Sequence, residues 1–394
     1  MLYAPCGAEK EKNMFKQTPV MGWNSWNTFG VDINEQLLRE TADAMVESGL
    51  KDAGYEYVII DDGWQEGYRD ENDRLVPNKT KFPSGIKALA DYVHSKGLKL
   101  GIYSSSGHLT CMGLPASYEY EFIDAQTFAE WEVDYLKYDF CHRAGATASP
   151  LLYRRMGTAL ANCGRDILFS TCSWGMDETE KWVKTVGAGM WRSTGDICDS
   201  WESIRDLTLK QLPLQVYNGQ NCFNDMDMLV VGMNAKGNVG FKGCTFEEYR
   251  SHFAIWAMLN SPLIIGCDIR NMTEETKQIL MNKKVIAVNQ DPDARQPFLL
   301  PGVHTIFGQN EKQFAWAKLL HNGDYAIGLF NMDDTDAHLS ISSVDLGIDR
   351  LSGKKLVYEN LLSDGAVPVI GSSVVCLPVK AHDCVMLRAK VVNA

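Results

Sequence analysis

Short apolar runs alternate with amphipathic stretches from about residue 18 to about residue 292. The runs have the length of buried strands, and the stretches between them carry apolar residues at helical spacing. A repeat of roughly 25–40 residues is typical of βαβ units, and eight units in about 270 residues predict a closed (β/α)8 TIM barrel. The predicted strands are Val20–Trp23, Tyr57–Ile60, Leu98–Tyr103, Tyr135–Tyr138, Ile167–Thr171, Met190–Ser193, a less regular one within Asn221–Val231, and Pro262–Ile265. The predicted helices include Asn34–Glu47, Ile86–Ser95, Leu151–Leu160 and Phe246–Leu259.

An open, doubly wound sheet is the alternative arrangement for such a repeat. That fold usually binds a dinucleotide at a glycine-rich turn after its first strand, with the pattern GxGxxG. Here the corresponding turn reads GWNSWNTFG. The barrel is therefore the favoured interpretation, and no cofactor is expected.

The pattern changes after Gln290-Asp291-Pro292, where short alternating strands broken by Gly, Asn and Asp turns replace the strand–helix repeat. This pattern predicts an antiparallel β-sandwich of about 100 residues, packed tightly on the barrel. The predicted domains are a catalytic barrel over residues 1–292 and a sandwich over residues 293–394. The predicted sandwich strands are Phe314–Lys318, Tyr325–Asn331, Lys355–Glu359, Ser373–Leu377 and Cys384–Ala389.

Charge and hydropathy limit the kinds of molecule that this chain is expected to bind. A net charge of −12 disfavours nucleic acid and anionic membranes. No stretch approaches the ~18 apolar residues of a membrane span. The N-terminal segment lacks the basic start and apolar run of a secretory signal, so we expect a cytoplasmic protein, or a secreted one if a signal has been removed. The oligomeric state is not predictable from these features.

Acidic, aromatic and cationic residues follow the ends of the predicted strands, where a barrel places its functional groups. The common alternative for such an aspartate is a helix N-cap. That alternative suits Asp199 and Ser200 well, but suits the adjacent Asp61 and Asp62 poorly, because one cap needs one oxygen. The strand-end residues are Trp23, Trp26, Asp61, Asp62, Trp64, Tyr103, Lys137, Asp139, Trp191, Arg192 and Asp196.

Two separated carboxylates in such a basin suit glycoside hydrolysis, in which one attacks the anomeric carbon and the other transfers protons. The other polar groups would bind sugar hydroxyls. Metal-dependent hydrolysis is a weaker alternative, because only His142 lies near the strand-end acids. We therefore expect no metal.

Seven segments, in this order, resemble glycoside hydrolase family 27: MGWNSWNTFG, YVIIDDGWQ, GIYSSSGHLTC, YLKYDFC, CSWG, WRSTGDI and NDMDMLVVG. This melibiase-like family contains the α-galactosidases and the α-N-acetylgalactosaminidases. The resemblance covers residues from about 17 to about 292, and more weakly the sandwich. It implies a retaining exo-glycosidase that removes terminal α-linked galactose from small or oligosaccharide α-galactosides.

The resemblance also implies roles for particular residues. Asp139 corresponds to the nucleophile and Asp196 to the acid/base, and Cys111 and Cys141 to a disulfide in the pocket wall. The implied substrate-binding residues are Trp26, Asp61, Asp62, Tyr103, Cys111, Lys137, Cys141, Ser173, Trp174, Arg192 and Met228.

Two further expectations join the resemblance to physical reasoning. Lys137 lies two residues before Asp139 on a strand, so both face the same side, and the ammonium would hold the nucleophile ionised. Asp196 must carry a proton near neutral pH, and partial burial in an aromatic pocket would favour its protonated form.

Residues near the nucleophile and in the CSWG segment depart from the family pattern. Phe140 is bulkier than the Asn or Gly common there. Ser173 stands where plant-type α-galactosidases carry Glu, and a short residue there resembles the α-N-acetylgalactosaminidases. Met176, however, fills a position where the α-N-acetylgalactosaminidases keep Ala. We favour galactose as the substrate sugar. An α-N-acetylgalactosaminidase, a β-L-arabinopyranosidase and an inactive galactoside-binding barrel are the alternatives.

Overall fold

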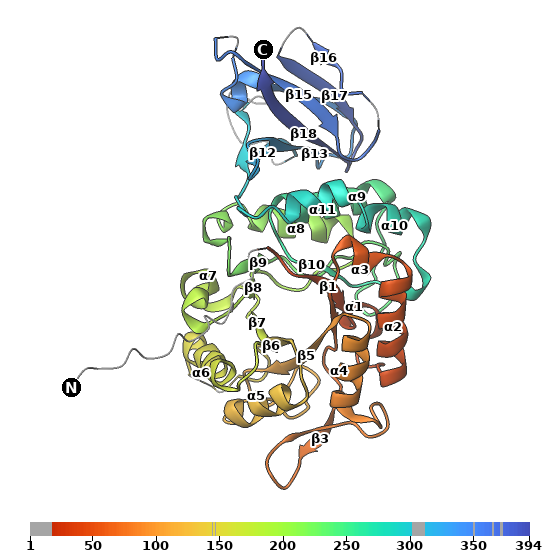
Figure 1. Ribbon diagram of the computed structural model, residues 1–394, viewed down its shortest axis with the longest axis vertical. Coiled ribbons are helices and arrows are strands. Elements are labelled where there is room, and N and C mark those ends of the chain that lie inside the picture. Colours follow the sequence, from red (N-terminus) through yellow and green to blue (C-terminus); the bar gives the residue numbers. More distant parts are fainter. Residues whose placement is uncertain are drawn as a thin grey trace, which may run out of the picture.

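The computed structural model describes residues 18–143, 145, 147–301, 312–349, 351–364, 366–370 and 373–394. The N-terminal segment on which the expectation about a secretory signal rests lies outside these residues. Eight parallel strands surround a central axis, with helices outside them (Figure 1). The strands are β1 (Met21–Asn24), β2 (Tyr57–Ile59), β5 (Lys99–Ser105), β6 (Tyr135–Asp139), β7 (Leu168–Thr171), β8 (Met190–Arg192), β9 (Phe223–Asp225) and β10 (Leu263–Ile265).

The strand order is β10-β1-β2-β5-β6-β7-β8-β9, so neighbours along the chain are neighbours in the sheet. The sheet closes beyond β9, where Leu229 forms a parallel bridge with Ile265 of β10. The Leu229 N–H donates to the carbonyl of Ile264 at 2.7 Å, and the Gly266 N–H donates back to Leu229 at 2.9 Å. The predicted (β/α)8 barrel is confirmed. Each predicted strand lies at its expected place because a strand covered on both faces is a continuous apolar run.

Helices connect successive strands of the barrel, and polar N-cap residues stand at the start of several of these helices. The Asn34 side chain accepts the Leu37 N–H at the start of α2, and Thr245 and Glu248 form a capping box at the start of α9. The α-helices are α1 (Trp26–Phe29), α2 (Glu35–Glu47), α3 (Leu50–Ala53), α4 (Gly85–Ser95), α5 (Glu121–Glu130), α6 (Ser149–Asn162), α7 (Thr179–Trp182), α8 (Trp201–Lys210), α9 (Phe246–Met258), α10 (Glu274–Leu280) and α11 (Lys283–Asn289). The 3-10 helices are η1 (Met176–Glu178), η2 (Val183–Val186), η3 (Gln215–Tyr217), η4 (Ile269–Asn271) and η6 (Ser343–Leu346).

A hairpin interrupts the connection between β2 and α4 and was not predicted. Its strands are β3 (Gln65–Arg69) and β4 (Leu75–Pro77), and it extends away from the barrel in Figure 1. The Arg69 guanidinium ties it back by a bidentate contact with the buried Asp124 of α5, at 2.7 and 2.8 Å. This ion pair therefore fixes the base of the hairpin to α5.

Two antiparallel sheets form the C-terminal part, which confirms the predicted sandwich. One sheet has the order β11-β12-β13-β18-β15, and the other has the order β14-β17-β16. The structure adds β11, β14 and β16 to the predicted strands. The bounds are β11 (Phe298–Leu299), β12 (Gln313–Leu319), β13 (Tyr325–Asn331), β14 (Ala337–Ser342), β15 (Lys354–Asn360), β16 (Val369–Ile370), β17 (Val374–Val379) and β18 (Cys384–Asn393).

Helix α9 lies between the barrel and the sandwich and packs against both, so most of its residues are buried (Figure 1). Strand β12 also contacts both parts. Ala315 and Ala317 pack in the core of the sandwich, whereas Phe314 and Trp316 pack in the core of the barrel. Arg250 of α9 also pairs with Asp383 of the sandwich. The sandwich thus stabilises a helix that supports the barrel.

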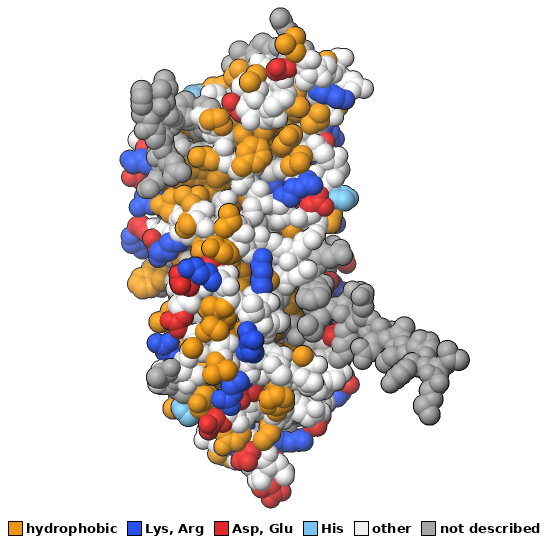
Figure 2. All heavy atoms as spheres, turned by 90° about the vertical axis from the view of Figure 1, so that its left-hand side faces the viewer, with side chains coloured by type: hydrophobic (Ala, Val, Ile, Leu, Met, Phe, Trp, Pro, Cys, Tyr) orange, Lys and Arg blue, Asp and Glu red, His pale blue; other side chains and the backbone are white. Residues whose placement is uncertain are grey.

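The face of the molecule in Figure 2 carries charged side chains of both signs, interspersed with hydrophobic ones. This mixture is typical of a solvated surface rather than of a nucleic-acid interface. In the part of the chain that the structure describes, the helices are too short or too polar to span a bilayer.

Candidate active site

A cavity of about 80 Å³ opens at the C-terminal ends of the barrel strands. All predicted site residues except Cys141 and Ser173 line it, although they come from seven different strand ends. This convergence is what a barrel mouth provides. The lining residues are Trp26, Asn27, Asp61, Asp62, Tyr103, Cys111, Lys137, Asp139, Cys172, Trp174, Arg192, Asp196, Asp227, Met228 and Val239.

Asp139 ends strand β6, and hydrogen bonds hold both of its carboxylate oxygens. Its Oδ1 accepts the Phe140 N–H at 2.9 Å, and its Oδ2 accepts the Tyr103 hydroxyl at 3.1 Å. Burial raises the pKa of the Asp139 carboxyl, and the positive charge of Lys137 and the Phe140 N–H oppose that rise. The result is a buried carboxylate in a fixed orientation.

Lys137 contacts Asp61 directly, and acts on Asp139 through its charge. Its Nζ lies 2.7 Å from Asp61 Oδ2, and both side chains are largely buried. Burial disfavours the ammonium, but the charges of Asp61 and Asp139 hold the pKa of Lys137 well above its ordinary value. Lys137 is therefore a permanent cation between two strand-end carboxylates.

Asp61 and Asp62 follow β2 and cap no helix, as the sequence pattern indicated. Asp61 Oδ1 accepts the Asp62 N–H, while Oδ2 also accepts the Asn24 amide at 2.8 Å. Asp62 accepts the Gly63 N–H at 2.7 Å and the Met112 N–H at 2.9 Å. Burial raises the pKa of Asp62 to about 6, against the effect of these N–H donors.

Arg192 lies between two carboxylates on the far strands. Its Nη2 donates to Asp196 Oδ1 at 2.8 Å and also pairs with the buried Asp227. Asp227 accepts the Ile197 N–H at 2.7 Å as well, which fixes the loop that carries Asp196. Burial raises the pKa of Asp227, and the Arg192 guanidinium opposes that rise.

The expectation that Asp196 is partly buried is wrong, since its side chain is 69% exposed. Asp196 follows the end of β8 on an open loop, so water reaches it freely.

Cys111 and Cys141 form a disulfide, as the resemblance implied. Cys111 lines the cavity, and its sulfur lies 3.4 Å from the Tyr103 hydroxyl. The bond joins the loops that follow β5 and β6. It therefore holds the loop after β5 against the end of the strand that carries Asp139.

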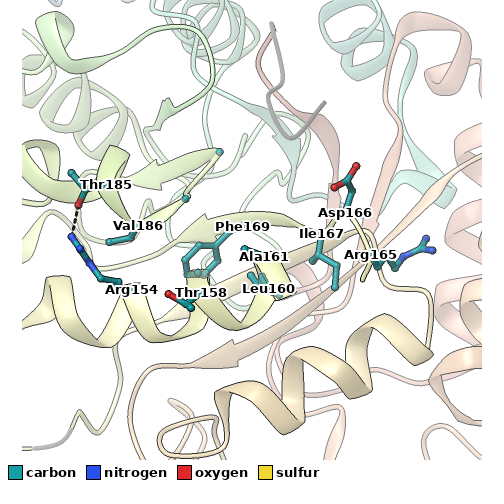
Figure 3. A pocket seen from close by; sticks show the side chains of 13 residues that line it. Arg154, Thr158, Leu160, Ala161, Arg165, Asp166, Ile167, Phe169, Thr185 and Val186 are labelled. Atoms are coloured by element: carbon teal, nitrogen blue, oxygen red, sulfur yellow. Dashed lines mark hydrogen bonds between the residues drawn. The ribbon is translucent and has the colours of Figure 1, made fainter. Parts of the chain in front are cut away.

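A larger cavity, of about 280 Å³, lies between α6 and the segments that lead into β7 and β8 (Figure 3). It has none of the predicted site residues, and its polar groups are partly satisfied. Arg154 donates to Thr185 at 3.1 Å, and Arg165 pairs with Asp134 at 2.6 Å. It lies toward the N-terminal ends of the strands, which in barrels serve stability. The smaller cavity is therefore the candidate active site.

Two family models match the chain, one described as "Alpha galactosidase A" over residues 18–291 and one as "Alpha galactosidase C-terminal beta sandwich domain" over residues 311–389. The first covers most of the chain and every residue of the candidate site. The chain belongs to the α-galactosidase family, glycoside hydrolase family 27.

Several α-galactosidases resemble the chain over most of its length. The enzyme of Cyamopsis tetragonoloba is 46% identical over 340 residues, which are 86% of this chain and 79% of that protein. The crystal structure of α-galactosidase I from Mortierella vinacea is 37% identical with a TM-score of 0.87, and covers 95% of this chain and 97% of its own. A structure of the Saccharomyces cerevisiae α-galactosidase with raffinose is 30% identical with a TM-score of 0.82, and covers 95% and 98%.

Ser173, which the α-galactosidase family pattern placed in the substrate site, does not line the cavity. It is fully buried, and its hydroxyl is hydrogen-bonded with that of Thr179. Met176 is 42% exposed and does not line the cavity either. Cys172 and Trp174 are the lining residues of this segment. In this member of the family, Phe140 also points into the core, where its ring stacks on Tyr153.

Four lining residues were not predicted: Asn27, Cys172, Asp227 and Val239. Asp227 is the most consequential, because it pairs with Arg192. The signal was present in the sequence, since Asp227 directly precedes the predicted Met228 within the NDMDM segment. It was missed because the strand before it, β9, is only Phe223–Asp225 and gives a weak pattern.

We expect the Lys137→Met variant to need a higher pH for activity. The methionine keeps the volume but removes the cation that opposes the rise in the pKa of Asp139. For Asp139 acting as the nucleophile, as the resemblance implies, the ionised form is the reactive one, so the acid limb of kcat/KM against pH should move to higher pH. An acid limb at the wild-type position would contradict this role of Lys137.

Proposed function

We propose that this chain hydrolyses terminal α-linked galactose from α-galactosides, with Asp139 as the nucleophile and Asp196 as the acid/base. One observation carries the assignment of roles. The two acids line one cavity in opposite environments: Asp139 is buried and held through both oxygens, whereas Asp196 is largely exposed. A carboxylate fixed by two hydrogen bonds near the Lys137 cation is suited to attack the sugar, whereas a carboxylate open to water is suited to activate it.

The reaction then follows in two steps. An oxygen of Asp139 attacks the anomeric carbon, while the bond to the leaving oxygen breaks and that oxygen takes a proton from Asp196. Asp196, now a carboxylate, removes a proton from water, which attacks the same carbon and releases Asp139. Two inversions restore the α configuration. An exposed Asp196 suits the second step, because water must reach it.

The remaining lining groups would bind the sugar. Asp61 and Asp62 supply acceptors for hydroxyl groups, while Lys137 and Arg192 supply donors. The indole of Trp26 offers an apolar face for the C–H side of the ring. The family names of the relatives and the raffinose in the yeast structure support a neutral oligosaccharide as the substrate.

Galactose is preferred over N-acetylgalactosamine because Ser173 and Met176, the residues that raised the question of an acetamide, do not line the cavity. The p-nitrophenyl α-glycosides of galactose and N-acetylgalactosamine, with the β-L-arabinopyranoside, test the assignment. We expect the highest kcat/KM for galactose. No turnover of any of the three would favour an inactive galactoside-binding barrel.

Hydrolysis should proceed with retention of configuration. We propose that the carboxyl groups of Asp139 and Asp196 are separated by about 5–7 Å in the working enzyme, a range that includes the spacing of about 5–5.5 Å at which one carboxylate attacks the sugar directly. A proton NMR time course of p-nitrophenyl α-galactoside hydrolysis should show α-galactose first and the β anomer only after mutarotation. β-galactose as the first product would contradict a double displacement.

For the compartment, the Cys111–Cys141 disulfide favours the secreted location over the cytoplasmic one, because such bonds persist in oxidising environments.

A further inference from the structure

We propose that Phe241 is the binding platform for the second sugar ring of an oligosaccharide substrate, the ring next to the galactose that is released. The inference rests on the proposed function and goes beyond it. Phe241 is 74% exposed, which makes it the most exposed phenylalanine in the part of the chain that the structure describes. An exposed aromatic ring next to a sugar pocket offers an apolar face to a ligand.

Asp199, which is fully buried, holds the loop that carries Phe241. The backbone of Asp199 donates to the carbonyl of Val239 and accepts the N–H of Gly243, both at 3.0 Å. Its carboxylate accepts the Ala235 N–H at 2.8 Å and the Tyr249 hydroxyl at 2.9 Å. Hydrogen bonds therefore anchor the chain both before and after Phe241.

The same loop reaches the catalytic cavity. Val239, two residues before Phe241, lines the cavity, and the neighbouring Asn238 N–H donates to the carbonyl of Asn27 at 2.7 Å. Asn27 also lines the cavity, next to Trp26. Phe241 thus follows a cavity-lining residue by two positions, and its side chain is left to solvent.

The leaving group is expected on this side of the cavity. Asp196 must lie beside the oxygen that it protonates, so the second sugar ring extends past Asp196. Asp196 precedes Asp199 by three residues, and Asp199 pairs directly with the strand-like segment from Val239 to Gly243. The exposed Phe241 ring is consequently available to the part of the substrate that leaves the cavity.

The chemistry around Phe241 favours a neutral sugar. Lys242, next to Phe241, is paired with Glu202 at 2.7 Å, so the loop offers no unpaired charge at that position. One phenylalanine is also far smaller than the area of a stable protein interface. A hexose ring, with C–H groups on one face, matches a single aromatic face.

Raffinose and methyl α-galactoside together test the proposal, because only raffinose carries a second ring. Phe241→Ala should lower kcat/KM for raffinose about three- to tenfold, a loss of the size of one aromatic contact. The value for methyl α-galactoside should stay within about twofold, which also shows that the variant is folded. Phe241→Trp should retain raffinose hydrolysis. Phe298→Ala, which removes a 45% exposed ring from the sandwich, should change neither substrate.

An equal fall for both substrates, or no change for either, would overturn the role of Phe241 while leaving the proposed function in place. A wild-type enzyme that hydrolyses neither substrate would instead overturn the proposed function, and the inference with it.

Discussion

Replacing Asp139 with glycine should lower kcat/KM on α-galactosides by about 10⁴-fold or more, the scale seen when a covalent nucleophile is removed. No neighbour can substitute for it. Asp61 is engaged by Lys137 and Asn24, and the two oxygens of Asp62 accept backbone N–H groups. The measurement is kcat/KM for p-nitrophenyl α-galactoside.

A matched variant separates this effect from a general loss of an aspartate. Asp166 is exposed and lines the larger cavity of Figure 3, away from the catalytic groups. Asp166→Gly should retain activity close to that of the wild type. If Asp139→Gly also keeps most of its activity, with an unchanged thermal midpoint, Asp139 is not the nucleophile.

Replacing Asp196 with glycine should have an effect that depends on the leaving group. With raffinose, whose leaving oxygen needs a proton, kcat/KM should fall by about 10²–10⁴-fold, the usual contribution of a general acid. With an aryl galactoside of a very acidic phenol, the first step needs no proton, so the covalent intermediate should form and accumulate.

A burst of phenol in the pre-steady state, followed by slow turnover, is the expected signature of Asp196→Gly. Loss of the paired carboxylate also leaves Arg192 with Asp227 as its ion-pair partner, so the fold should persist. Equal losses on raffinose and on the activated substrate would show that Asp196 is not the proton donor.

The barrel was predictable from the sequence because its strands are buried on both faces. A continuous apolar run such as Tyr57–Ile60 has few other interpretations in a chain with a strand–helix repeat. The hairpin β3–β4 was not predictable in the same way, since β3 is mostly polar, β4 has only three residues and the register is irregular. Strand β14 alternates apolar and polar residues correctly, but its serines resemble a turn.

The site residues that lie at the ends of the strands were predictable from the sequence. Asp61, Lys137, Asp139 and Arg192 follow directly from the position of their strands. Side-chain direction in the loops beyond the strands depends on tertiary contacts that no sequence pattern gives. The Ser173 hydroxyl, for example, is hydrogen-bonded with that of Thr179 and does not line the cavity. For the same reason, no pattern in the sequence distinguishes the open loop of Asp196 from a closed one.

The assignment of Asp139 as nucleophile and Asp196 as acid/base is tested most directly by azide, a nucleophile that needs no general base. In Asp196→Gly, azide should attack the accumulated galactosyl-enzyme, and two inversions should give α-galactosyl azide. In Asp139→Gly, azide should attack the substrate itself, and one inversion should give the β-azide. The measurement is the anomeric configuration of each azide by proton NMR. The β-azide from Asp196→Gly and the α-azide from Asp139→Gly would contradict the account, because Asp196 would then be the nucleophile.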